Sequence, residues 1–165
     1  MDRSIQDSPS PLRFPLFLDL TQKNAVVVGG GKIAARRVFV LLDFVRRITV
    51  IAPELRPELE SLASDDRIDV IRREFLQEDL AHADLVITAT GVKAVDECVW
   101  RSCRDSRIPV NVASDQSKCD FFFPGIARKG NLIAGVSACG ADHGLAKRTT
   151  EAIRALLERI SEEAE

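Results

Sequence analysis

Three consecutive glycines, Gly29–Gly31, follow the β-branched run Val26–Val28 and precede a helix-forming stretch. With Ala34 they satisfy the spacing G-x-G-x-x-G/A, in which the first glycine permits a tight turn and the second lets a pyrophosphate approach the backbone. The small third residue lets the helix pack closely on the strand. Because the first N–H groups of that helix would be unpaired, the segment predicts a dinucleotide-binding turn. The alternative is a packing turn in a ligand-free, flavodoxin-like domain.

The acidic side chain that usually holds the ribose is absent from its expected place. It normally ends the second strand, about 20 residues after the glycines. Here that strand ends in VIAP, and the nearest acid is Glu54. Backbone groups near Pro53 and Glu54 would then hold the ribose. No arginine directly follows the strand to meet a 2′-phosphate, although Arg56 is close, so the sequence favours NAD over NADP.

The elements around this turn alternate between strand and helix. Apolar and β-branched runs predict strands at 25–30, 47–53, 67–75, 83–90 and 108–114, with an edge strand or lead-in at 15–20. Helices are expected at 32–42, 54–64 and 93–106. Alternation with short links requires parallel strands joined by crossover connections. We therefore expect an α/β fold with a Rossmann-like, doubly wound parallel sheet.

The pattern changes after residue 114. Residues 121–137 hold two extended segments around the turn sequence RKGN, which predicts a β-hairpin. A helix is expected at about 142–162, because apolar positions recur on one helical face. The expected regions are a flexible tail at 1–13, a nucleotide-binding domain at 14–115 and a hairpin–helix region at 116–165.

The composition excludes several classes of protein. A formal net charge of −2, 5% aromatic residues and no tyrosine argue against nucleic acid as a partner. No apolar run approaches the roughly 18–20 residues of a membrane helix, and the polar N-terminus does not resemble a secretory signal. Four cysteines without a C-x-x-C pair do not support a zinc ribbon. They indicate a cytoplasmic protein with reduced thiols.

Four longer stretches carry a family resemblance: PLFLDLTQKNAVVVGGGKIAARR, ITVIAPEL, REFLQEDLAHADLVITAT and PVNVASDQSKCDFFFPGIARKGNLIAGVS. With the following helix they cover about residues 14–160 and resemble precorrin-2 dehydrogenase, the NAD-dependent part of siroheme synthase. The last stretch is the most specific, since a generic Rossmann domain has no reason to carry it. The resemblance implies an enzyme that oxidises precorrin-2 to sirohydrochlorin with NAD, and some members also insert ferrous iron. It also implies a homodimer in which the hairpin–helix region is exchanged across the interface.

The resemblance places cofactor contacts at three points of the predicted sheet edge. They fall on the glycine turn, on the end of the second strand and on the end of the fourth strand. By position they are Gly29, Gly30, Gly31, Lys32, Ile33, Pro53, Glu54, Ala89 and Thr90.

The catalytic position departs from the family, which usually has N-V-V/A-D with the aspartate implicated in dehydrogenation and chelation. This chain has Asn111–Ser114, with Asp115 one residue later. A serine cannot act as a carboxylate base near neutral pH unless another base activates it. Three interpretations stay open: Asp115 takes the role, Ser114 only positions the substrate, or the activity is reduced or altered. We favour Asp115, against the alternative of an ordinary solvated loop acid.

A second departure is SACGADHG, residues 137–144, where the family has a small-residue loop ending in Ser-Pro. Asp142 suits the N-cap of the last helix. Cys139, Asp142 and His143 also offer metal ligands. Capping is the favoured interpretation, and no metal site is predicted.

A polycarboxylate such as precorrin-2 needs local cations despite the acidic total. The chain has dibasic pairs at Arg36-Arg37, Arg46-Arg47, Arg72-Arg73, Arg128-Lys129 and Lys147-Arg148. Any single pair is typical of a solvated surface. The last two pairs follow the fifth strand, so Arg128, Lys129, Lys147 and Arg148 are the expected carboxylate contacts.

Other functions stay open on the sequence. One is a chelatase with vestigial dehydrogenase activity, consistent with the serine at 114. Another is an NAD-sensing regulatory domain, which would share the glycine turn but would not need CDFFFPGI or the basic residues after it. A third is a degenerate member acting as a scaffold.

Overall fold

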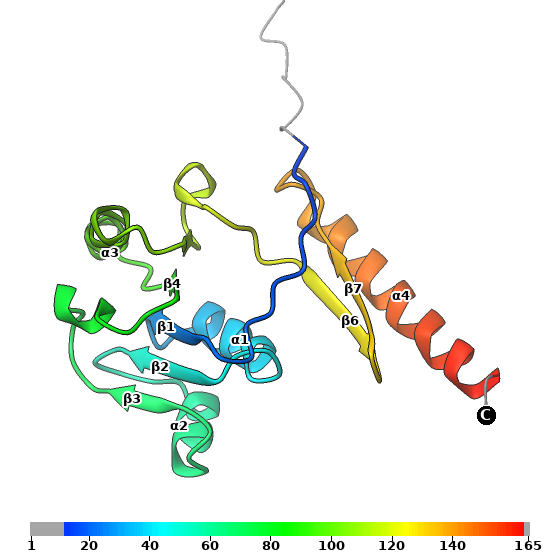
Figure 1. Cartoon of the computed structure of the whole chain (residues 1–165), viewed down its shortest axis with the longest axis horizontal. Helices are drawn as coiled ribbons and strands as arrows, with labels where there is room; N and C mark the ends of the chain where they lie inside the picture. Colours follow the sequence, from blue (N-terminus) through cyan, green and yellow to red (C-terminus); the bar gives the residue numbers. More distant parts are fainter. Residues whose placement is uncertain (1–11, 164–165) are drawn as a thin grey trace, which may run out of the picture. The chain divides into compact units, whose positions relative to one another are not determined.

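The computed structural model describes residues 12–163, so most of the tail expected at 1–13 lies outside the described residues. The chain divides into two compact units (Figure 1). The first, the nucleotide unit, spans Leu18–Phe123. The second, the hairpin–helix unit, contains Pro124 onward together with the residues before Leu18.

The nucleotide unit is built on a five-stranded parallel sheet of order β3-β2-β1-β4-β5. Its strands are β1 (Asn24–Val28), β2 (Arg47–Ile51), β3 (Asp69–Ile71), β4 (Leu85–Thr88) and β5 (Val110–Val112). The strand order changes direction between β1 and β4, which makes the carboxyl ends of these strands the place where such sheets bind ligands. The expected doubly wound parallel sheet is confirmed.

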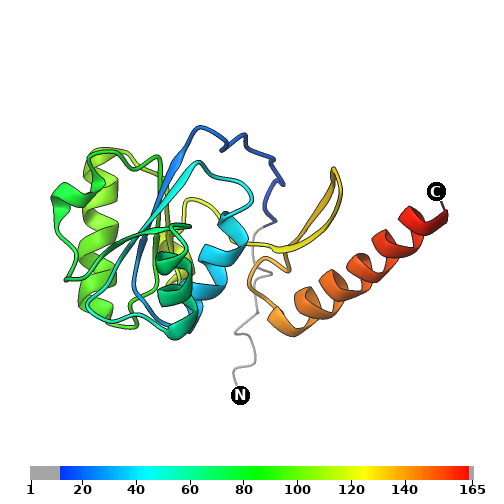
Figure 2. The same cartoon turned by 90° about the horizontal axis from the view of Figure 1, so that it is seen from below.

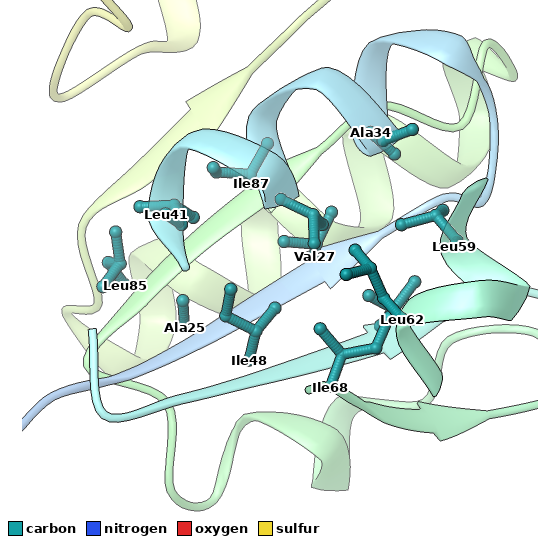
Figure 3. Packing of buried hydrophobic residues seen from close by; sticks show 13 residues of the cluster. Ala25, Val27, Ala34, Leu41, Ile48, Leu59, Leu62, Ile68, Leu85 and Ile87 are labelled. Atoms are coloured by element: carbon teal, nitrogen blue, oxygen red, sulfur yellow. The ribbon is translucent and has the colours of Figure 1, made fainter. Parts of the chain in front are cut away.

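Strand β1 is buried on both faces, as its unbroken apolar run predicts. Ala25 and Val27 belong to one hydrophobic cluster, whereas Val26 and Val28 belong to another. Figure 3 shows the first cluster, in which the helices cover β1 and β2. The two clusters fix the sheet between layers of helix and so hold its carboxyl edge in place.

Three helices cover the sheet: α1 (Lys32–Leu41), α2 (Pro57–Ser64) and α3 (Lys93–Ser106). Helices α1 and α2 supply Ala34, Leu41 and Leu59 to the first cluster, and α3 supplies Val99 to the second. The link from β3 to β4 contains only the 3₁₀ turn η1 (Gln77–Leu80), and a second such turn, η2 (Gln116–Lys118), follows β5.

Two expectations about the strands are corrected. Residues 15–20 form a lead-in and no edge strand, and Leu16, Phe17 and Leu18 are exposed, because a short alternating run without a pairing neighbour is not enough to make a strand. All five strands also end earlier than expected, and the first two show why. Gly29 turns the chain with a φ of +118°, and Pro53 lacks the N–H that would continue β2.

The hairpin–helix unit pairs β6 (Gly125–Lys129) with β7 (Leu132–Val136) in antiparallel register, and α4 (His143–Glu163) packs along them (Figure 1; turned by 90° in Figure 2). A Cβ on Gly125 would lie 2.2 Å from Thr150 Oγ1, so strand and helix meet closely there. The expected hairpin and helix are confirmed. No helix among residues 12–163 has the length and apolar character to cross a bilayer.

Candidate active site

The glycine turn between β1 and α1 is confined by the backbone of two other loops. A Cβ on Gly29 would lie 2.5 Å from the carbonyl oxygen of Ala89, just after β4. A Cβ on Gly30 would lie 2.0 Å from the carbonyl oxygen of Glu54, just after β2. Both contacts are to main chain, which cannot rotate away as a side chain can. Only glycine therefore fits at positions 29 and 30.

Gly31 is in a different situation, because a Cβ there would meet nothing within 4 Å. It is the N-cap of α1, and no side chain caps that helix. The first turn holds no acid, and its first residue, Lys32, is exposed and forms no ion pair within residues 12–163. An open approach to an uncapped helix N-terminus beside a cation is the geometry that a pyrophosphate needs.

The loop after β2 lies against this turn through its backbone. Arg56 N–H donates to the carbonyl of Gly30 over 3.0 Å, while Pro53 and Glu54 are exposed. The Arg56 guanidinium pairs with Glu58 at 3.1 Å. That hydrogen bond from Arg56 lowers the pKa of Glu58. Main-chain groups of Pro53 and Glu54 are thus available beside the glycine turn, whereas the nearest arginine is engaged elsewhere.

The end of β4 completes the same edge of the sheet. The register aligns Val28 of β1 with Thr88 of β4, and Thr88 with Val112 of β5. Ala89 N–H donates to the carbonyl of Val28 over 2.8 Å. Two residues beyond the aligned row come Gly30, Thr90 and Ser114, so the structure brings the glycine turn, the end of β4 and the predicted catalytic loop after β5 to one edge.

A buried carboxylate that the sequence analysis did not single out lies behind this edge. Asp96, in the first turn of α3, is only 2% exposed. Its Oδ1 accepts from Thr88 Oγ1 at 2.5 Å, from Thr90 Oγ1 at 2.7 Å and from Thr90 N at 3.2 Å. Its Oδ2 accepts from Ser114 Oγ at 2.7 Å. Burial by itself would raise the pKa of Asp96, but these hydrogen bonds outweigh it and keep that pKa below its ordinary value.

Ser114 and Asp115 have separate partners. Ser114 is exposed, with its hydroxyl proton directed to Asp96. The Asp115 carboxylate caps η2: Oδ1 accepts from Ser117 N at 3.0 Å and from Ser117 Oγ at 2.6 Å, and Oδ2 pairs with Lys118 at 3.3 Å. The hydrogen bonds from Ser117 are the main cause of a lowered pKa of Asp115. The loop therefore presents a serine hydroxyl backed by one acid, and a second acid that is already used as a cap.

The loop before α4 shows the capping expected of Asp142, whose Oδ1 accepts from Leu145 N at 2.8 Å. Cys139 has a φ of +51°, and its carbonyl accepts from Arg13 at 3.0 Å. Within residues 12–163, no three His, Cys, Asp or Glu side chains are grouped so that they could hold a metal ion.

The four predicted substrate cations all belong to the hairpin–helix unit. Lys129 on β6 pairs with Glu158 of α4, and Lys147 pairs with Glu151 at 3.8 Å. Positions 147 and 158 are eleven residues apart on α4, which corresponds to about 16 Å. The two dibasic pairs therefore lie at separate points along this helix. Arg148 is exposed and forms no ion pair within the part of the chain that the structure describes.

Three arginines of the earlier dibasic pairs have acidic partners nearby. Arg47 pairs with Asp69, Arg72 pairs with Glu60 at 2.6 Å, and Arg73 pairs with Asp79 at 2.7 Å. These arginines are engaged within the nucleotide unit, as expected of a solvated surface.

A shallow hollow of about 590 Å³ lies at the opposite edge of the sheet, beside Leu80, Ala83 and Ile108. These residues precede β4 and β5, whereas the glycine turn lies at the carboxyl ends of the strands. The hollow is therefore no part of the site.

Comparisons with known proteins agree with this geometry. Residues 16–125 match a family described as putative NAD(P)-binding. The siroheme synthase of Mannheimia succiniciproducens is 38% identical over 144 residues, which are 87% of this chain and 30% of that protein. Siroheme synthase 1 of Yersinia enterocolitica is 37% identical over 143 residues, with the same coverage of both proteins. The chain thus spans about a third of the length of these relatives.

Among solved structures, SirC, precorrin-2 dehydrogenase, superposes with a TM-score of 0.72 at 31% identity, covering 87% of this chain and 70% of that one. The match extends beyond the nucleotide unit, since residues 18–123 alone are a smaller share of the chain. This chain therefore belongs to the precorrin-2 dehydrogenase family, whose sequence and fold it shares with the corresponding part of the siroheme synthases.

Proposed function

We propose that this protein oxidises precorrin-2 to sirohydrochlorin with NAD, as a step of siroheme biosynthesis. The single observation that carries the proposal is the glycine turn. Two of its glycines are required by the backbone around them, and the third opens an uncapped helix N-terminus. Family membership supplies the substrate, because a relative with this fold is named a precorrin-2 dehydrogenase.

The residues at the carboxyl edge would divide the binding of NAD among them. Gly31, Lys32 and Ile33 would receive the pyrophosphate on the N-terminus of α1. Backbone groups of Pro53 and Glu54 would hold the ribose, and Ala89 and Thr90 would lie beside the nicotinamide. The pairing of Arg56 with Glu58 supports NAD over NADP, because a 2′-phosphate would have to compete with that carboxylate.

The reaction removes a hydride and a proton from the macrocycle, and NAD, when bound, would supply the hydride acceptor. The chain has to orient the substrate and receive its proton. Ser114 supports the first role, since its exposed oxygen lies at the cofactor edge. Asp115 stays the candidate for the second role, that of receiving the proton, although its carboxylate already accepts hydrogen bonds from Ser117 and Lys118.

The cationic residues of the hairpin–helix unit would bind the carboxylates of the substrate. Arg148 is the strongest of the four candidates, because no acid within the described residues neutralises it. Lys129 and Lys147 would have to exchange a glutamate for a substrate carboxylate. Arg128, exposed on β6, is the fourth candidate.

A homodimer is part of the proposal. Large apolar side chains of the hairpin–helix unit are exposed in the single chain: Leu132, Ile133, Leu145, Leu156 and Ile160. A second copy of this chain would cover them, as the family resemblance implies.

The four thiols are free, which fits the reducing cytoplasm expected from the sequence.

An absorbance assay on the purified protein tests the function. Precorrin-2 should convert to sirohydrochlorin only when NAD is added, with NADH formed in equal amount. Conversion only of sirohydrochlorin, and only with ferrous ion, would identify a chelatase instead. Binding of NAD without binding of any tetrapyrrole would identify a nucleotide-sensing domain.

A further inference from the structure

The strongest unexplained feature of the nucleotide unit is the Asp96 carboxylate. It is buried, yet all four groups that donate to it within the described residues are neutral: three hydroxyl groups and one backbone N–H. Within the described residues it forms no ion pair. The nearby cation, Lys118, pairs with the neighbouring Glu97 and with Asp115. A buried charge is normally paired with an opposite charge, so a carboxylate left uncompensated beside a ligand edge calls for a function.

The two oxygens of Asp96 have different tasks. Oδ1 accepts three bonds from Thr88 and Thr90, which tie α3 to the end of β4. Stability accounts for these bonds. Oδ2 accepts one bond, from the exposed Ser114 beyond the end of a different strand, eighteen residues away in sequence. Water could satisfy the exposed Ser114 hydroxyl, but this hydroxyl donates instead to the buried Oδ2, which fixes the direction of its proton.

We propose that Asp96 is a positioning residue that fixes the Ser114 hydroxyl as a hydrogen-bond acceptor for the substrate. A hydroxyl has one proton and two lone pairs. Because the proton of Ser114 is donated to Asp96, the lone pairs are left for a donor at the open edge of the sheet. Asp96 also places a negative charge directly behind that oxygen, where low exposure keeps it from being screened.

This inference rests on the proposed function and deepens it. The family resemblance expects a carboxylate at position 114, which would supply an acceptor oxygen and a negative charge in one side chain. This chain supplies the oxygen from Ser114 and the charge from Asp96. The ligand that would use the pair is a donor group on the reduced macrocycle, such as a pyrrole N–H.

Asp96→Asn is the first test, because Thr88 and Thr90 would keep the amide oxygen in the place of Oδ1. The amide NH₂ would then face Ser114 and turn the hydroxyl proton outward, which reverses its polarity toward the substrate. We expect kcat to fall about tenfold or more, with KM for NAD unchanged. Ser114→Ala should lose a similar amount, and the double variant should be no worse than Ser114→Ala, because the two side chains act as one unit.

The double variant Asp96→Asn with Ser114→Asp is the rescue experiment. It moves the carboxylate from position 96 to position 114 and restores an acceptor with a charge at the edge. We expect it to recover most of the activity that Asp96→Asn loses. Ser114→Asp alone should instead shift the pH profile of kcat, because two carboxylates in contact raise the pKa of one of them.

The outcomes separate the two proposals. If the wild-type protein does not oxidise precorrin-2, the proposed function fails and this inference fails with it. If the wild type is active but Ser114→Ala keeps full kcat, the function stands and the role of Asp96 is overturned. Loss of NAD binding in Asp96→Asn would show that the variant displaces Thr90 at the cofactor edge, in which case Ser114→Ala, at an exposed position, decides alone. Activity lost in Asp115→Asn but kept in Ser114→Ala would assign the role to Asp115.

Discussion

The carbonyl oxygen of Glu54 lies 2.0 Å from the point where a Cβ on Gly30 would stand. The loop after β2 therefore lies directly against the middle of the glycine turn. Neither backbone segment can shift to make room for a side chain without moving the strand that precedes it. Within the three consecutive glycines, folding therefore requires glycine at position 30, whereas the open site at position 31 is the one expected to serve ligand binding.

Gly30→Ala should destabilise the protein by about 2 kcal/mol or more, since the methyl group would overlap main chain. Gly31→Ala is the matched control and should change the free energy of unfolding by no more than about 0.5 kcal/mol, because its site is open. Urea denaturation of the two variants measures the difference. Equal losses would contradict the assignment of separate roles.

Gly31→Asp should weaken NAD binding about tenfold or more, because a carboxylate would replace open space where the pyrophosphate is expected. Gly31→Asn has nearly the same shape without the charge and should weaken binding much less. Calorimetric titration with NAD compares them, and thermal unfolding checks that both are folded. Equal affinities of the two variants would place the pyrophosphate elsewhere.

The glycine turn could be predicted from the sequence because its signal is local. The strand, the glycine spacing and the helix start are contiguous, and α3 was predicted with its observed limits for the same reason. The strand ends were less predictable, since they depend on single residues such as Gly29 and Pro53.

Asp96 could not be found in this way. Its neighbours in sequence give it the pattern of an exposed acid in a helical first turn. Its burial arises only when β4 and β5 lie side by side and bring Thr88, Thr90 and Ser114 around it. The serine at position 114 was visible in the sequence as a departure, but the acid behind it needed the tertiary structure.

Acid should destabilise the wild type more steeply than the Asp96→Asn variant. Since the folded-state pKa of Asp96 is lowered, its ionised form stabilises the fold above the unfolded-state pKa. That stabilisation is lost as the pH falls through the folded-state pKa, that is, below about pH 4. Urea denaturation at about a dozen pH values between about pH 2.5 and pH 7 gives the free energy of unfolding of both proteins as a function of pH. A difference in free energy of unfolding that stays constant with pH would contradict the role of the charge. Glu151→Gln is the control and should show the same pH dependence as the wild type.

Leu156→Glu should convert a dimer into a monomer, because it would place a charge on the exposed apolar side of α4. Leu156→Met keeps the apolar surface and should remain dimeric. Sedimentation velocity distinguishes the two masses directly. A wild-type protein that sediments as a monomer would overturn the dimer proposal.

Arg148→Gln should raise KM for precorrin-2 about two- to fivefold, the range expected for an exposed charge pair, while KM for NAD stays unchanged. Lys129→Gln should have a smaller effect, since Lys129 is already paired with Glu158 and its loss also frees that glutamate.

Arg46→Gln, in the nucleotide unit, is the control for general loss of positive charge. The effect of Arg148→Gln should shrink in higher salt, because exposed charges are screened within about 8–10 Å at physiological ionic strength. An equal increase in KM for Arg46→Gln would mean that the substrate responds to the overall charge of the protein and that Arg148 makes no contact with a carboxylate.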